Sequence, residues 1–223
     1  MASWMVHLRI ADKLLDKIPG LSPTEFIVGN IAPDSGVPNE DWSAFSPDKK
    51  VSHFKGAGNM AIPESYAEKY FTLDQRSGYN EQQFSFYLGY LTHLITDVLW
   101  VRDVYAPSKD KFPELWAPEG KNSIWKLKAD WYDLDFKYLR DHPGFRAFRL
   151  YLGAAGFVND FMDEFSTDAF DNRRQYITGW YLEGRENLDR KYPFLTEQEM
   201  TVFVNCASDE ILDILHTKYG LKL

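Results

Sequence analysis

The stretch that decides the fold is NEQQFSFYLGYLTHLITDVLWVRDVY, residues 80–105. Its apolar side chains cover nearly the whole circumference of a helix, and Asn80 with Gln83 forms a capping-box pattern at the start. A helix that is apolar all round is a buried one. We therefore expect an all-α protein built around this central helix, which carries the pattern His93-x-x-x-Asp97.

Shorter segments with helical periodicity flank the central helix. In residues 4–18 apolar side chains recur every three or four positions, and Pro19-Gly20 ends the pattern. A second helix begins at Pro23 and must end before Pro33, and a short one follows Pro63. Further helices are predicted over 122–140, 143–155, 157–170, 173–189 and 196–217. No convincing alternating pattern predicts a strand and no linker divides the chain, so residues 1–223 are expected to form one domain.

The segment 32–62 is different in character. Prolines and glycines are scattered through it among polar residues, and it has no sustained helical or strand period. Long irregular segments within compact domains are uncommon and often functional. We therefore expect this segment to contribute to a site.

Composition narrows the classes of partner. The 223 residues include 25 Lys+Arg against 33 Asp+Glu, a net charge of −8, which disfavours binding to duplex nucleic acid. No apolar run is long enough to predict a transmembrane segment, and the first residues do not have the pattern of a signal peptide. The single cysteine, Cys206, cannot form an intramolecular disulfide, so a cytoplasmic location is expected.

The sharpest local signal is the pair His93 and Asp97. Residues four apart share one helix face, so both side chains can reach one ion. A buried carboxylate is unfavourable unless it is paired or bound to metal, and a structural His–Asp hydrogen bond would also satisfy it. Three further potential ligands favour a metal site over a structural hydrogen bond, because each lies on an apolar face or at an irregular position. They are His7, Asp34 and His53.

Four motifs, taken in order, resemble the zinc-dependent phospholipase C family, whose superfamily also contains single-strand-preferring nucleases. They are Ser3-Trp4-x-x-His7, Gly29-Asn30-Ile31-Ala32-Pro33-Asp34, Ser52-His53-Phe54 and Tyr90-Leu91-Thr92-His93-Leu94-Ile95-Thr96-Asp97. The resemblance covers roughly residues 3–140. It implies a mostly helical fold with a cluster of up to three zinc ions that hydrolyses a phosphodiester.

The resemblance also assigns ligands by position. It implies that His53, His93 and Asp34 hold one zinc ion, that Asp97 bridges it to a second ion, and that His7 binds the second. Two neighbouring cations can activate water and stabilise the charge on the phosphate and the leaving oxygen. Asp34 is alternatively a general base, because a carboxylate beside the attacking water can take its proton. Asp34 and Asp97 are therefore the expected catalytic carboxylates.

The sequence departs from the family's pattern at two places. Secreted members use the free amine of an N-terminal tryptophan as a ligand, whereas three residues precede Trp4 here. The family's histidine six residues after the bridging aspartate is Asp103 here, and the His-x-x-x-Glu pair that should follow is missing, with Asp130 and Asp135 the nearest substitutes. A third site built from Asp103 and Asp130 would offer only carboxylate oxygens, which are hard ligands and suit Mg²⁺, Mn²⁺ or Ca²⁺ better than zinc.

Three hypotheses remain open. The first is a metal-dependent phosphoric diester hydrolase that acts on a small phosphodiester or phospholipid with two zinc ions. The second is a noncatalytic, metal-stabilised helical domain that binds a phosphorylated ligand or a protein partner. The third is a structural domain with a buried His–Asp pair and no ion. His142, in a turn, and His216, near the end of the last helix, are expected to have no catalytic role.

Overall fold

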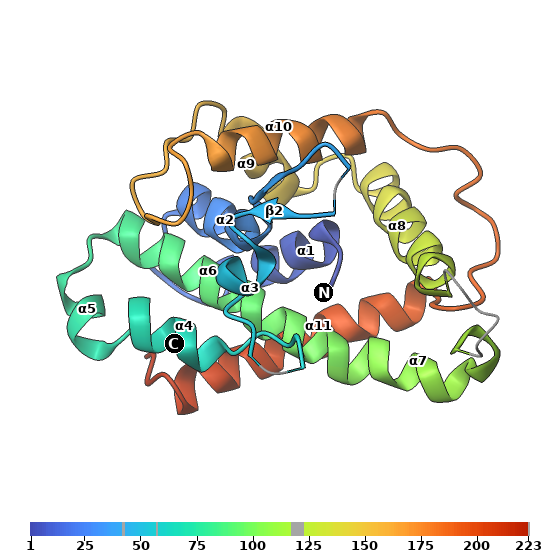
Figure 1. Ribbon diagram of the computed structural model, residues 1–223, viewed down its shortest axis with the longest axis horizontal. Coiled ribbons are helices and arrows are strands. Elements are labelled where there is room, and N and C mark those ends of the chain that lie inside the picture. The colour runs from blue at the N-terminus through green and yellow to red at the C-terminus, as the bar shows by residue number, and fades with distance from the viewer. Residues whose placement is uncertain (42, 57, 117–122, 223) are drawn as a thin grey trace.

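The computed structural model describes residues 1–41, 43–56, 58–116 and 123–222. Across these ranges the protein is essentially all-α, as predicted, with two strands of two residues each. Helix α6 (Glu81–Trp100) runs through the middle of the molecule (Figure 1) and is buried along most of its length. The central helix that carries His93 and Asp97 is thereby confirmed.

Helix α6 begins as predicted, and helical structure continues without a break beyond the predicted end at residue 105. Both hydrogen bonds of the capping box are present, from the Gln83 amide to Asn80 Oδ1 at 2.8 Å and from the Asn80 amide to Gln83 Oε1 at 3.2 Å. After Trp100 a π-helical turn, η2 (Val101–Tyr105), leads directly into α7 (Ala106–Lys111). The wider turn comes just before Pro107, which has no amide hydrogen to donate to a regular helical ladder.

Two helices pack against α6 and bring the N-terminal segment to it: α1 (Trp4–Leu15) and α2 (Pro23–Ile31). The contact between α2 and α6 is a direct contact of backbones. A Cβ atom added to Gly29 would lie 2.2 Å from the Phe86 carbonyl oxygen, and one added to Gly89 would lie 2.2 Å from the Phe26 carbonyl oxygen. Only glycine permits this approach, so the relative position of the two helices is closely fixed.

The remaining helices surround this central group. In the view of Figure 1, α9 and α10 lie above α6, α11 runs below it, α7 continues it toward the lower right, and α8 stands at the right-hand end. No helix among the described residues is long and apolar enough to cross a membrane. The other helical elements are η1 (Ala32–Asp34), α3 (Lys49–Ser52), α4 (Pro63–Tyr70), α5 (Leu73–Gly78), η3 (Pro113–Trp116), α8 (Ser123–Asp141), α9 (Arg146–Gly153), α10 (Ala169–Leu182) and α11 (Glu197–Thr217).

The segment 32–62 is more ordered than its sequence predicts. After η1 the chain forms a small antiparallel pair of strands, β1 (Val37–Pro38) and β2 (Phe45–Ser46), in which Val37 pairs with Ser46. The expectation of an irregular segment without strands is wrong at this pair. Two residues per strand are too few to produce a recognisable alternation of polar and apolar side chains.

The predicted helix over 157–170 is also wrong, and the helix expected over 173–189 is α10, which spans Ala169–Leu182. The Asn159 side chain organises the loop instead. Its Oδ1 accepts hydrogen bonds from the Phe161 and Met162 amides, and its Nδ2 donates to the carbonyl oxygens of Met162 and Phe165. These bonds satisfy backbone groups that a helix would otherwise pair. The Phe161 ring packs on Phe86 of α6, with centroids 4.2 Å apart.

Candidate metal centre

His93 and Asp97 lie on one face of α6, as their spacing predicts. The His93 side chain is fully buried and Asp97 is 4% exposed. His93 Nε2 and Asp97 Oδ2 are 3.7 Å apart. The central helix therefore places an imidazole and a carboxylate next to each other in the interior.

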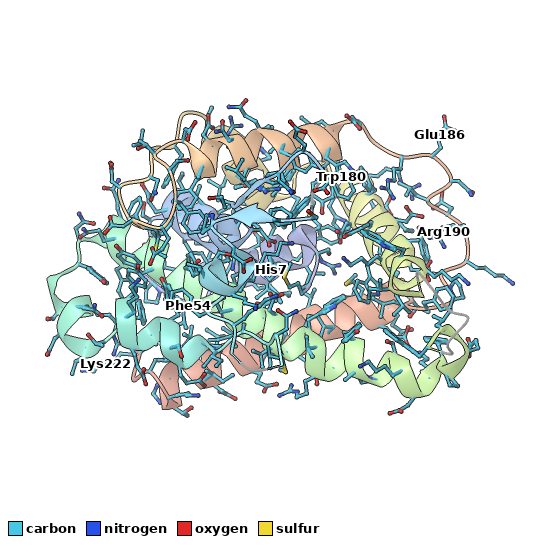
Figure 2. The ribbon with its side chains drawn as sticks, in the orientation of Figure 1. His7, Phe54, Trp180, Glu186, Arg190 and Lys222 are labelled. Carbon is cyan, nitrogen blue, oxygen red and sulfur yellow. The ribbon has the colours of Figure 1, made fainter. Side chains whose placement is uncertain are left out.

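Helix α1 brings His7 to the same place. Its ring stacks on the His93 ring, with centroids 3.8 Å apart and an angle of 2° between the planes. His7 Nε2 lies 3.4 Å from Asp97 Oδ1. In Figure 2 His7 lies near the centre of the molecule, between the layers of helices.

Asp34 and His53 come from the irregular segment, where the sequence predicted a contribution to a site. Asp34 is the last residue of η1, directly after α2, and His53 directly follows α3. Asp34 Oδ1 lies 3.3 Å from His53 Nε2, while Trp4 Nε1 donates a hydrogen bond of 2.9 Å to Asp34 Oδ2. Tyr90 of α6 donates through its hydroxyl to the Ser52 carbonyl oxygen, which ties this segment to the central helix.

The close contact of α2 and α6 determines which nitrogen of His93 is available. The Asn30 carbonyl oxygen lies 2.7 Å from His93 Nδ1. Because a carbonyl oxygen can only accept a hydrogen bond, we assign the proton to Nδ1, which leaves the lone pair on Nε2 of the neutral ring. Burial, together with the neighbouring His7, lowers the pKa of His93 to about 3, so the ring is neutral near pH 7. A backbone carbonyl in this position orients a histidine ligand.

Four imidazole nitrogens at this place are buried and have no hydrogen-bond partner within the described residues. They are Nδ1 and Nε2 of His7, Nε2 of His53 and Nε2 of His93. Most buried polar atoms in proteins are paired, so such a cluster requires an explanation. Ligand atoms of His7, His93 and Asp97 lie within 4.8 Å of one another, as do those of Asp34, His53 and His93. Neutral imidazoles with carboxylates are a donor set that zinc accepts.

Asp97 lies between the two groups of ligands. Its Oδ1 is the atom close to His7, whereas its Oδ2 lies 3.7 Å from His93 Nε2 and 3.9 Å from His53 Nε2. The Ala2 backbone amide donates a 2.8 Å hydrogen bond to Oδ1 and holds the carboxylate in this orientation. The two oxygens thus face different histidines.

Both carboxylates of the centre are ionised. Burial acts to raise the pKa of Asp97, but the nearby N-terminal charge and the two histidines outweigh it and lower that pKa far below its usual range. The pKa of Asp34 is likewise held well below its usual range, because the neighbouring histidines outweigh its burial. The centre therefore offers two negative charges to a cation.

Asp103 and Asp130, the candidates for a third site, are not gathered with the other five residues and belong to neither three-residue ligand group of the described chain. Asp103 pairs with Arg102 on the surface, at 2.6 Å. Asp130 is buried, receives a 2.7 Å bond from Arg190 Nη1 and also accepts from the Phe194 amide. The partners of these two carboxylates are groups of the protein itself.

Asp135 is a further buried carboxylate close to the N-terminal segment. It accepts 2.8 Å hydrogen bonds from the hydroxyls of Ser3 and Tyr181. Burial raises the pKa of Asp135 to about 7. His142 and His216 lie elsewhere, with Nδ1 of His142 beside the Tyr138 carbonyl oxygen and Nδ1 of His216 beside that of Leu221.

The residues that position the five gathered side chains were not predicted from the sequence. Trp4 and Asn30 lie within the motifs that were singled out, but nothing in their spacing shows that one binds Asp34 and the other orients His93. The Ala2 amide that binds Asp97 is a backbone group, which leaves no signature in the sequence. A polar residue beside a glycine on a buried helix, such as Asn30, is the kind of signal that could have been used.

Two adjoining clefts reach the centre. The larger, about 630 Å³, is lined by Asp34, and the second, about 600 Å³, by Asp97. They share Met1, Lys49, Lys128 and Trp131, so they open side by side. Partial burial in these clefts lowers the pKa of Lys128. The centre is therefore buried but can be reached by a small molecule.

Comparison with known proteins bears on this arrangement. Residues 6–100 match the family model of zinc dependent phospholipase C. The match spans less than half of the 223 residues, yet it contains all five gathered side chains, and the resemblance drawn from the motifs is confirmed there. No curated protein and no solved structure matches the chain. The cleft walls contributed by α8 and α10 lie outside the zinc dependent phospholipase C match.

Proposed function

We propose that the protein is a metal-dependent phosphoric diester hydrolase of the phospholipase C type, which acts on a small phosphodiester or a phospholipid. The observation that carries the proposal is the group of buried imidazole nitrogens without partners beside two ionised carboxylates. A purely structural His–Asp pair would leave most of these nitrogens unsatisfied. We further propose that residues 1–223 act as one domain, because one continuous core cluster includes residues from α1 to α11.

Each ligand has a role that follows from its position. Asp34, His53 and His93 would hold one zinc ion and His7 the second, with one Asp97 oxygen directed to each. His93 belongs to both groups but has only Nε2 available, so it can bind one ion. Bound zinc would supply Lewis acidity, which lowers the pKa of water and neutralises charge on phosphate oxygens.

The chain's own groups set the orientation and the charge. Trp4 fixes one oxygen of Asp34 and leaves the other directed toward His53. With one oxygen held by Trp4 and the other facing the His53 ring, we propose that Asp34 acts as a ligand and not as the general base. The depth of the centre limits access to a phosphate group presented through the two clefts.

The test is metal content together with turnover, measured on the same preparations. We expect elemental analysis of the purified protein to find about two zinc ions per chain. The zinc-loaded protein should hydrolyse bis(p-nitrophenyl) phosphate. His93→Ala should lower both metal content and turnover, the latter by about two orders of magnitude or more, with near-native helical content. His216→Ala is the matched control and should change neither.

The outcomes separate the three hypotheses. Two bound ions without turnover of any phosphodiester would favour the noncatalytic metal-stabilised domain that binds a phosphorylated ligand or a protein partner. Absence of metal even after reconstitution would leave the structural domain and remove the hydrolase. If His93→Ala retained both metal and turnover, the assignment of the centre would be wrong.

A further inference from the structure

The two clefts beside the metal centre have a charge opposite to that of the whole chain. Apart from Asp34 and Asp97, the charged side chains that line them are five cations and one carboxylate, Asp41. The chain as a whole carries 25 Lys+Arg against 33 Asp+Glu. Cations concentrated in a cleft of an acidic protein focus the field on that cleft. The five are Lys49, Lys55, Lys109, Lys128 and Arg173.

Arg173 of α10 is the most deeply placed of these cations. It is 6% exposed, and its Nη2 donates to the Gly36 carbonyl oxygen at 2.5 Å. No carboxylate of the described chain forms a salt bridge with Arg173. The arginines that do form salt bridges have a guanidinium nitrogen 2.6–2.8 Å from a carboxylate oxygen. A buried guanidinium without a counter-ion is unfavourable, and its planar fork suits a phosphate or a carboxylate.

The larger cleft has aromatic walls, which by themselves would suit a cationic headgroup. Aromatic faces attract quaternary ammonium groups. Here the protein's own cations already lie over several of these rings: the Lys49 ammonium is 4.2 Å from the Phe45 centroid, and the Lys128 ammonium is 4.8 Å from that of Trp125. Arg173 lies 5.5 Å from the Tyr176 centroid. These side chains would repel a second cation that entered the cleft.

We propose, on the basis of the hydrolase function above, that the substrate is a small phosphodiester with a second anionic group, either a phosphate or a carboxylate. The cleft beside Asp34 binds this second group through Lys49, Lys128 and Arg173, while the scissile phosphate lies at the metal centre. In the reaction water forms a bond to phosphorus, the bond from phosphorus to the leaving alcohol oxygen breaks, and the proton from water passes to solvent or to the alcohol. No other reactant is required.

The first test is binding, which needs no catalysis. Calorimetric titration of the protein without metal would compare phosphoglycolate with phosphorylcholine, two phosphate esters of similar size whose far ends are a carboxylate and a quaternary ammonium. We expect phosphoglycolate to bind at least about tenfold more tightly, since like charges repel and opposite charges attract in a partly desolvated cleft. Equal binding of the two, or tighter binding of phosphorylcholine, would overturn the proposal.

Two lysines of α8 provide matched variants. Lys128 lines both clefts, whereas Lys126 is exposed and lines neither. Lys128→Met should lower the preference for phosphoglycolate about threefold to tenfold, and Lys126→Met should leave it unchanged. An equal loss in both variants would mean that the preference comes from the general field of the protein and not from the cleft.

The second test is turnover of three p-nitrophenyl phosphodiesters whose second alcohol is glycolate, ethanol or choline, with the zinc-loaded protein. We expect kcat/KM to fall in that order. No turnover of any ester, with the binding preference intact, would contradict the hydrolase but not the anion-binding cleft. Turnover of all three without a preference would contradict the cleft but not the hydrolase.

The anionic group can belong to a lipid headgroup or to a water-soluble ester. Dihexanoyl phosphatidylserine and dihexanoyl phosphatidylcholine, compared below their micelle concentration, distinguish these sources. A preference for the serine headgroup would assign the group to a lipid. A preference confined to the glycolate ester would assign it to a soluble molecule, and either result supports the cleft.

Discussion

The buried histidines of residues 6–100 and the buried aspartates of residues 101–223 differ in the partners that the chain gives them. In the first region the buried imidazoles of His7, His53 and His93 present nitrogens that have no hydrogen-bond partner within the described chain. In the second, Asp130 is held by Arg190 and Asp135 by two hydroxyls. Burial alone therefore does not mark a binding site in this protein. The candidate centre is distinguished by several buried imidazole nitrogens without hydrogen-bond partners that are gathered at one place beside two carboxylates.

The two regions also differ in how closely the backbone fixes the positions of their functional side chains. The candidate ligands of the first lie on α1 and α6, in η1 and directly after α3, and the backbones of α2 and α6 touch at Gly29 and Gly89. Most of the residues that the second region contributes to the cleft beside Asp34 lie on α8 and α10, which are separated along the chain by α9 and the loop 154–168. We expect the metal centre to depend on the helix contact and the cleft to tolerate change more readily.

The largest expected effect concerns the pH dependence of the first region. The pKa of His93 is about 3 in the folded protein, against an ordinary value of 6.5. Between these values the unfolded state binds more protons, so stability falls as the pH decreases. The unfolding free energy of the metal-free wild type should fall, relative to that of His93→Gln, by roughly 3 to 5 kcal/mol between pH 7 and pH 3.

Chemical denaturation of both proteins across this pH range measures the difference. The comparison between the two variants removes the contributions of other titrating groups, including Asp135, whose raised pKa acts in the opposite direction. If the difference in unfolding free energy between the wild type and His93→Gln did not change with pH, burial would not lower the pKa of His93.

The next effect compares one glycine from each region. Gly89→Ala would place a Cβ 2.2 Å from the Phe26 carbonyl oxygen, so α2 and α6 must separate. We expect a loss of about 2 to 4 kcal/mol in unfolding free energy and weaker zinc binding, because the Asn30 carbonyl moves away from His93. Gly179→Ala in α10, where a Cβ meets nothing within 4 Å, should stabilise the protein by roughly 0.5 to 1 kcal/mol. Similar results for both variants would contradict the importance of the helix contact.

The sequence predicted the first region better than the second for a physical reason. The spacing of His93 and Asp97 fixes their common helix face, and the apolar surroundings of His7 predict that it points inward. Such relations depend on helix geometry over a few residues. The presence of α6, its cap and its burial followed from the same local rules.

The failures occurred where side chains replace regular backbone pairing or where distant segments meet. The apolar spacing of residues 157–170 imitates a helix, but Asn159 captures the backbone groups and Phe161 packs on α6. The pairing of Asp130 with Arg190 joins residues 60 positions apart, which no local pattern reveals. The cations of the cleft are likewise gathered from α3, α8 and α10.

Asp130 provides an intermediate effect, in the second region. The buried Asp130 carboxylate accepts hydrogen bonds from Arg190 and from the Phe194 amide, and Asp130→Asn weakens both. We expect a loss of about 1 to 3 kcal/mol in unfolding free energy, with the zinc content unchanged. Thermal denaturation and elemental analysis of the variant measure the two quantities. If the variant bound one metal ion fewer than the wild type, Asp130 would be a metal ligand, as the sequence suggested for a third site.

The smallest effect is expected for Asp103, which lies just beyond the matched region. Its carboxylate is 39% exposed, and its partner Arg102 also binds Glu210, so that Asp103→Asn leaves the arginine with a counter-ion. Exposed ion pairs contribute little, and the unfolding free energy should change by less than about 0.5 kcal/mol. Zinc content and turnover should match those of the wild type. A selective loss of Mn²⁺ or Mg²⁺ binding in this variant would instead place a metal ligand at the π-helical turn and extend the centre beyond residue 100.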